Sequence, residues 1–226
     1  DIGVDYGLNY LGEMEFQKLT YIDNGVPSLS IGGFTNGVRV VDMAKAYSTL
    51  ANGGVYNDQT CIRRIDHEHN GELTKNLKAH SQVVYQQDSA YMLTDILKGT
   101  LTESYGTGYG LALENDMPAA GKTGTTNEAK DLVFAGFTPY YTAAIWATYD
   151  THAEFPESDR EFHKRLWAKV MNEIHEGLAD MDFETSATVQ EATICTKTGL
   201  LARSSCPSIT EYFAVSDLPT ERCKGH

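Results

Sequence analysis

The sequence predicts an α+β fold in which helices pack on an antiparallel sheet. Two stretches with helical periodicity come early in the chain, at residues 40–51 and 88–103. Two strand-like stretches then follow one another directly, at 132–138 and 141–148, and a third helical stretch comes after them. Strands that are neighbours in sequence and joined by a short turn pair antiparallel, whereas a parallel sheet requires a long crossover between strands.

The three helical stretches carry recognisable ends. The first ends at Asn52-Gly53-Gly54, because glycine tolerates the left-handed cap conformation. The second ends before the glycine-containing segment 104–108, and the third is predicted to start at Ser158 with a capping box to Glu161. Apolar residues in the second helix are Met92, Leu93, Ile96, Leu97 and Leu101. The predicted buried face of the third helix consists of residues four positions apart: Phe162, Leu166, Val170 and Ile174.

Three further segments read as β structure. Residues 61–77 form a predicted hairpin, with Asn70-Gly71 as a type I′ turn. The aromatic stretch 140–149 is expected to belong to the sheet core. After Asp180 the chain is rich in Thr and Ser and loses its helical period. We therefore divide the chain into a main part, 1–180, and a small β-like, cysteine-containing tail, 181–226.

The charge balance excludes some partners. The formal net charge of the 226-residue chain is -13. A nucleic-acid-binding surface needs Lys and Arg to displace counterions, so no nucleic acid is expected as a partner. No apolar run approaches the roughly 20 residues of a membrane span. The chain also opens without a signal peptide, and we expect any export or anchor segment of the parent protein to lie upstream.

The most informative segment is Lys122-Thr123-Gly124-Thr125, which precedes a strand. Lys122 supplies a point charge, and the two threonines supply hydroxyl donors. Gly124 lets a ligand approach the backbone closely. Backbone N–H groups on such a strand edge can also stabilise a developing oxyanion. The same tripeptide recurs at 197–199 without matching context, and we interpret that second copy as structural.

A wider resemblance supports the first copy. Residues 120–126 and 131–139 resemble the third motif of class A penicillin-binding proteins, in which Lys-Thr-Gly-Thr-Thr precedes a D-x-W-F-x-G-Y-T-P strand. Residues 28–54 and 199–223 are similar to further segments of that family. The chain is thus identified as similar to the C-terminal part of the transpeptidase domain of a bifunctional, class A member. Two departures, Val133 for Trp and Ser216-Asp217 for Gly-Thr, are expected to leave the site around Lys122 untouched.

The resemblance implies a fold and a reaction. The fold is a helical cluster against a five-stranded antiparallel sheet. The reaction is D,D-transpeptidation, in which a serine attacks the D-Ala-D-Ala bond of a peptidoglycan stem peptide and the acyl group passes to a neighbouring amine. β-Lactams trap that serine. Lys122 would be catalytic through proton transfer, Thr123 and Thr125 would hold the substrate carboxylate, and the Thr125 N–H would form half of the oxyanion hole. No cofactor is implied for catalysis. The implied location is the extracytoplasmic face of the bacterial membrane, with an N-terminal anchor helix in the parent.

The nucleophile that this family requires is missing. No lysine in the chain has a serine three residues before it, and no serine has an asparagine two residues after it, so S-x-x-K and S-x-N are both absent. We expect the N-terminal part of the same domain to carry both motifs, and the isolated chain to be inactive. The alternatives are a non-catalytic binding or assembly module, or a β-lactamase or D,D-carboxypeptidase relative. Residues 43–54 and the cysteine tail favour class A.

Several histidines and cysteines are possible metal ligands. His67-Glu68-His69 lies at the predicted hairpin tip and is interpreted as solvated, and His163 and His175 are expected at the surface. The tail offers a more serious set of ligands, which is Cys195, Cys206, Cys223 and His226. Three states are open for this set: a structural Zn²⁺ site, one disulfide, or free thiols.

Overall fold

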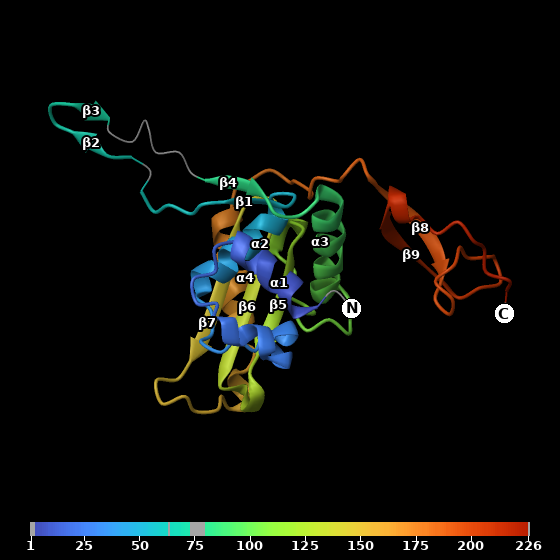
Figure 1. Ribbon diagram of the computed structural model, residues 1–226, viewed down its shortest axis with the longest axis horizontal. Helices are drawn as coiled ribbons and strands as arrows, with labels where there is room; N and C mark the ends of the chain where they lie inside the picture. Colours follow the sequence, from blue (N-terminus) through green and yellow to red (C-terminus); the bar gives the residue numbers. More distant parts are fainter. Residues whose placement is uncertain (1–2, 63, 73–79, 226) are drawn as a thin grey trace.

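A three-stranded antiparallel sheet forms the centre of the main body (Figure 1). The computed structural model describes residues 3–62, 64–72 and 80–225. The sheet has the order β5 (Ala120–Thr125), β6 (Asp131–Phe137) and β7 (Thr142–Thr148). The predicted α+β class is confirmed. The resemblance implied five strands in this sheet, and the described residues supply three of them.

Helices cover both faces of this sheet. Phe134 and Phe137 of β6 lie three residues apart, so their side chains point to opposite faces. Phe134 packs edge-on against Trp167 of α4 (Phe162–His175), and Phe137 packs against Tyr47 of α2 (Val40–Ala51). The third long helix, α3 (Gln87–Thr102), runs beside β5 (Figure 1). A shorter helix, α1 (Val4–Glu13), begins the described chain.

The buried face of α4 is not the predicted one. Leu166, Val170 and Ile174 are 42–45% exposed, whereas Trp167 and Met171 are 1% and 0% exposed. The true face lies one residue further along, at 163, 167, 171 and 175, which has the same spacing of four. The predicted capping box is also absent, because Glu161 is the N-cap without a side-chain hydrogen bond and Ser158 donates to Asp159.

The two histidines expected at the surface are instead buried at 2% exposure. His175 lies between the Met171 carbonyl and the Thr138 hydroxyl, at 2.6 and 2.7 Å. The carbonyl can only accept, so Nδ1 is the donor to Met171, while Nε2 forms the hydrogen bond with the Thr138 hydroxyl. This bond ties the end of α4 to the β6–β7 turn. Burial lowers the pKa of the other histidine, His163, which therefore stays neutral near pH 7.

The two ends of α3 lie within one residue of the predicted bounds, 88 and 103. Its predicted apolar face is buried only in part. Leu97 and Leu101 are buried as expected, while Leu93 and Ile96 are exposed. Thr94 is buried in their place. Its hydroxyl donates to the Ala90 carbonyl at 2.8 Å, and this hydrogen bond makes burial of the threonine inexpensive.

Short strands complete the main body. The strands β1 (Val55–Asn57) and β4 (Ser81–Val83) pair antiparallel at the base of the predicted hairpin. Further out, β2 (Asp66–His67) pairs with β3 (Gly71–Glu72). His67 lies opposite Gly71, so the loop contains three residues and not the two of a type I′ turn. Residues 63 and 73–79 of the predicted hairpin lie outside the described residues.

The tail extends from the side of the body next to α3 (Figure 1). It contains an antiparallel pair, β8 (Val189–Cys195) and β9 (Ser208–Ala214). Tyr212 of β9 meets Tyr91 of α3 edge-on, with ring centroids 5.2 Å apart. No helix of the described ranges is long and apolar enough to cross a bilayer.

The position of the buried face of α4 can be tested by truncating two adjacent residues in this chain. Trp167→Ala should lower the free energy of unfolding by about 3–5 kcal/mol, because it empties the space between α4 and Phe134. Leu166→Ala should cost less than about 1 kcal/mol. Urea denaturation followed by circular dichroism measures both, and a larger loss for Leu166→Ala than for Trp167→Ala would mean that α4 packs through the predicted face.

Candidate functional site

The Lys-Thr-Gly-Thr segment occupies an edge of the central sheet. The strand β5 pairs with β6 on one side, with Gly121 opposite Gly136 and Thr125 opposite Leu132. On its other side no strand among the described residues pairs with it. Two cavities of about 660 and 680 Å³ lie elsewhere, beside α2 and α3 and beside α4, and neither is lined by residues of the segment. The edge therefore carries no further strand, although α3 packs beside it at Gly121.

Two glycines allow β5 to lie close to β6. A Cβ atom on Gly121 would come within 2.8 Å of the Phe134 ring and of the Ala135 carbonyl oxygen. A Cβ on Gly136 would come within 2.8 Å of the Trp167 ring. The ring atoms therefore occupy the space that side chains would need. The packing of α4 thus reaches the strand that carries the site.

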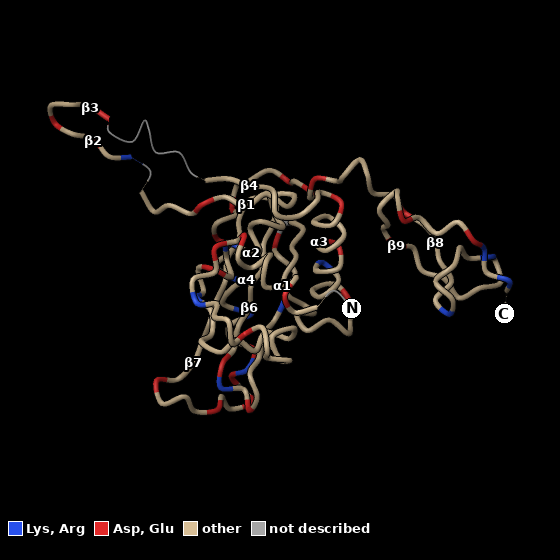
Figure 2. The backbone as a smooth tube through the Cα atoms, in the orientation of Figure 1, with Lys and Arg blue, Asp and Glu red and all other residues tan. Residues whose placement is uncertain are grey.

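The ammonium group of Lys122 contacts only neutral oxygens. Its Nζ atom lies 3.0 Å from the Thr123 carbonyl, 3.3 Å from the Thr123 hydroxyl and 3.4 Å from the Thr107 hydroxyl. Lys122 forms no ion pair with any residue in the described ranges. The chain has a net charge of -13, and its Asp and Glu residues recur along the main body (Figure 2), yet none of the described ones lies within ion-pair distance of Lys122.

Thr107 belongs to this site, although the sequence analysis treated it only as part of a helix-ending segment. Its hydroxyl accepts from the Thr123 hydroxyl at 2.8 Å and from Lys122. Its carbonyl accepts from Lys164 of α4 at 3.0 Å. Thr107 therefore links α4 to the lysine and threonine of β5.

The signal for Thr107 was its pair of flanking glycines. A Cβ on Gly106 would come within 2.3 Å of the Thr100 carbonyl oxygen, and one on Gly108 within 2.6 Å of the Leu101 side chain. The amide of Gly108 donates to that same carbonyl at 2.9 Å. Only glycine fits at position 106 against the backbone at the end of α3, whereas a side chain at 108 would require Leu101 to move.

Asp131 organises the end of β5. Its backbone N–H donates to the Thr126 hydroxyl at 2.8 Å, and its carboxylate accepts from that hydroxyl and from the Trp146 indole at 3.0 Å. Burial raises the pKa of Asp131, but hydrogen bonds from His152, Trp146 and Thr126 outweigh it and hold the pKa below its usual range. The carboxylate stays ionised and keeps Thr126 in place directly after Thr125.

The backbone of β5 directs N–H groups toward the open edge. The amide of Thr126 donates to Asp131 of β6, while the carbonyl of Gly121 accepts from the Thr100 hydroxyl on the opposite side. Backbone groups of successive strand residues point alternately to the two sides. The amides of Thr123 and Thr125 therefore point away from β6. On that side their N–H groups are available to donate hydrogen bonds to a ligand.

Two expectations about this segment can be compared with the structure. Val133 was expected not to touch the site, and this is wrong. It pairs with Gly124, and its Cβ lies 3.4 Å from where a Gly124 Cβ would be. The second Lys-Thr-Gly copy forms a turn after β8, in which the amides of Thr198 and Gly199 donate to the Cys195 carbonyl. Its donors are used within the turn.

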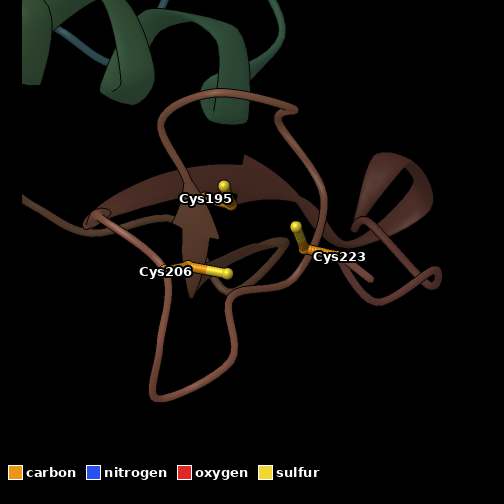
Figure 3. Close-up of side chains that lie close together, drawn as sticks. All are labelled: Cys195, Cys206 and Cys223. Carbon is orange, nitrogen blue, oxygen red and sulfur yellow. The ribbon is translucent and has the colours of Figure 1, made fainter. Parts of the chain in front are cut away.

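The cysteines of the tail come together, as Figure 3 shows. The sulfur atoms of Cys195, Cys206 and Cys223 all lie within 4.8 Å of one another. The fourth predicted ligand, His226, lies outside the described residues. The other histidine pair, His67 and His69, is exposed, and the Nδ1 atom of His67 accepts the backbone N–H of His69 at 3.1 Å.

Two family models match the chain, and together they cover most of its residues. The family model for the penicillin binding protein transpeptidase domain matches residues 1–176, and the model for the C-terminal domain of penicillin-binding protein 1A matches residues 186–226. The chain belongs to the penicillin-binding protein transpeptidase family. The resemblance to class A members is confirmed.

Particular relatives refine this assignment. Penicillin-binding protein 1A of Clostridium tetani is 31% identical over 234 residues, which cover all of this chain and 29% of that protein. Penicillin-binding protein 1A/1B of Bacillus subtilis is 33% identical over 223 residues, which cover 88% of this chain and 24% of that protein. The crystal structure of penicillin-binding protein 1A from Haemophilus influenzae shares the fold, with a TM-score of 0.79 at 19% identity over 98% of this chain and 38% of that one.

The glycines of β5 should respond differently to alanine. Gly121→Ala should lower the free energy of unfolding by about 1–3 kcal/mol, since its methyl group collides with Phe134 and with backbone. Gly124→Ala should be nearly neutral for stability, because its nearest neighbour lies at 3.4 Å. Urea denaturation of the two variants tests this, and equal destabilisation would contradict the described packing of β5.

Proposed function

We propose that this chain is part of a D,D-transpeptidase domain that cross-links peptidoglycan stem peptides by serine acyl transfer and is acylated by β-lactams. The observation that carries the proposal is the unpaired Lys122 at the open edge of β5, beside the hydroxyls of Thr123 and Thr107. An anionic group that binds there gains a cation and hydroxyl donors without displacing a protein carboxylate. The C-terminal carboxylate of a D-Ala-D-Ala peptide or of a β-lactam has this chemistry.

Each residue of the Lys-Thr-Gly-Thr segment has its own role in the proposed reaction. Thr123 and Thr125 hold the carboxylate through their hydroxyl groups, and Gly124 leaves the backbone accessible between them. The outward amide of Thr125 donates to the carbonyl oxygen under attack, where negative charge develops as the tetrahedral intermediate forms. Lys122 supplies positive charge that favours the carboxylate and assists proton transfer. Thr107 positions the Lys122 ammonium through its hydroxyl.

The nucleophile must come from a partner segment, for which we propose the N-terminal part of the same domain with S-x-x-K and S-x-N. Two surfaces support this. The far edge of β7 has no partner strand among the described residues. On α4, the apolar residues Leu166, Val170 and Ile174 are exposed in one stripe. Strands added at β7 would extend the sheet, and helices would cover the stripe.

The lengths of the relatives bear on the protein to which this chain belongs. This chain spans less than a third of the length of the curated relatives described above. We propose that the parent works at the extracytoplasmic face of the bacterial membrane, where its substrate is found. A carboxypeptidase or β-lactamase would use water as the acyl acceptor, and a non-catalytic module would not be acylated at all. The reaction of the complete protein with penicillin and with an acceptor amine distinguishes these outcomes.

The role of Thr125 can be tested in the complete protein. Thr125→Val should slow acylation by a fluorescent penicillin by about ten- to a hundred-fold, because a hydrogen bond to a charged group contributes about 1.5–3 kcal/mol. Thr198→Val, in the second Lys-Thr-Gly copy, is the matched control and should leave the acylation rate unchanged. Equal effects at both positions would show that the site has been assigned to the wrong segment.

The need for a partner segment can be tested by labelling. The isolated chain should not be covalently labelled by fluorescent penicillin, and addition of the N-terminal part should restore labelling. Leu166→Glu should weaken that restoration by placing a carboxylate in the apolar stripe of α4, whereas Arg165→Glu, on the adjacent exposed position, should not. Robust labelling of the 226-residue chain on one of its own serines would refute the proposal.

A further inference from the structure

The cysteine cluster of the tail is assembled from three separate segments (Figure 3). Cys195 ends β8, Cys206 follows the turn that begins at Arg203, and Cys223 lies near the end of the chain. Their sulfur atoms face one another and are mutually within 4.8 Å. Convergence of three thiols from distant positions places three soft donors around one point.

Backbone hydrogen bonds hold two of these cysteines on either side of one short segment. The amide of Cys195 donates to the Leu200 carbonyl at 2.8 Å, and the amide of Cys223 donates to the Leu201 carbonyl at 2.9 Å. Leu201 also forms bridges with Ile194 on one side and with Arg222 on the other. Main-chain hydrogen bonds therefore fix where the backbones of Cys195 and Cys223 lie relative to each other.

The cluster forms the interior of the tail. Cys195 and Cys223 are 0% and 1% exposed. The other buried apolar residues among the described part of the tail are Ala214 and Phe183, and Phe183 packs into the main body against Phe137. A module this small, with so little apolar surface inside, needs a covalent or metal crosslink to be stable alone.

Basic residues and one backbone amide lie close to the tail cysteines. The basic residues of the tail, which gather near its far end (Figure 2), are Lys197, Arg203, Arg222 and Lys224. Each lies within three positions of a cysteine in the sequence. The amide of Gly225 points to the Cys223 sulfur at 3.5 Å.

We propose that Cys195, Cys206 and Cys223 bind one structural Zn²⁺ ion that holds the tail together. Tetrahedral zinc takes sulfur ligands at about 2.3 Å, which places the sulfurs about 3.8 Å apart, within the spread observed here. A disulfide joins two sulfurs and leaves the third unused. Binding exchanges three thiol protons for the ion, so the step is balanced without any oxidant.

The proposed zinc ion would also affect how the tail contacts the main body. The β8–β9 pair touches the main body through Tyr212 and Tyr91 of α3, and α3 packs beside the strand of the proposed site. A zinc ion that fixes the end of β8 relative to the chain terminus keeps β9 folded and this contact in place. The proposal does not depend on the transpeptidase function, since it concerns the fold of the tail.

Metal analysis of the full-length protein tests the proposal. Protein purified without added metal or chelator should contain zinc that is lost, by one equivalent per chain, in Cys206→Ser. The matched control is Cys61→Ser, which removes the exposed cysteine of the predicted hairpin and should lose none. X-ray absorption of the unmodified protein should show zinc–sulfur distances of about 2.3 Å, a measurement that holds even if Cys206→Ser folds poorly.

Titration of the tail thiols distinguishes the zinc site from a disulfide and from free thiols. Under denaturing conditions with a chelator, all three tail thiols should react, and Co²⁺ added to the metal-free protein should give thiolate-to-cobalt charge-transfer absorption. A protein with no zinc and a disulfide between two tail cysteines would overturn the proposal. So would a protein with no zinc, no cobalt binding and all tail thiols free.

Discussion

The close approach of β5 to β6 at Gly121 and Gly136 is the constraint on which the proposed site depends. These two glycines lie opposite one another, and the rings of Phe134 and Trp167 occupy the space that side chains would fill. A single aromatic pair therefore joins α4, β6 and β5 into one rigid unit. Because Lys122 follows Gly121 directly, its position on the edge is set by packing on the far side of the strand.

An unpaired strand edge is a liability, and here it carries an exposed cation that has no ion-pair partner among the described residues. A charged group placed beside neutral oxygens gains little from the protein, and an unpaired edge exposes backbone donors that could pair with another chain. Here Thr107 and Lys164 hold the surroundings of Lys122 in place, while no described carboxylate neutralises it. Stability has not been maximised at this edge. That pattern is expected where an anionic ligand supplies the missing partner.

The sequence predicted some of this structure because the signals were local. The bounds of α2 followed from its apolar spacing and the glycines after it, and the edge segment followed from residue types over four positions. The face of α4 could not be decided in the same way, because residues 162–174 and 163–175 offer two series with the same spacing of four. Counting His163 and His175 as polar selected the wrong series, and only tertiary partners such as Thr138 show that a histidine can be buried there. Thr107 was missed because its contact with Thr123 links a loop to a strand across 16 positions.

The two Lys-Thr-Gly copies show why residue types alone do not define a site. In β5 the tripeptide is extended, and strand alternation leaves the amide of Thr123 directed away from β6. At 197–199 the same residues form a turn, with Gly199 at a φ of 71°, and their amides close onto the Cys195 carbonyl. Glycine lies in an extended strand in the first copy and takes a left-handed conformation in the second. The second copy uses its donors to place a cysteine, whereas the outward amides of the first are the ones that the proposed site would offer to a ligand.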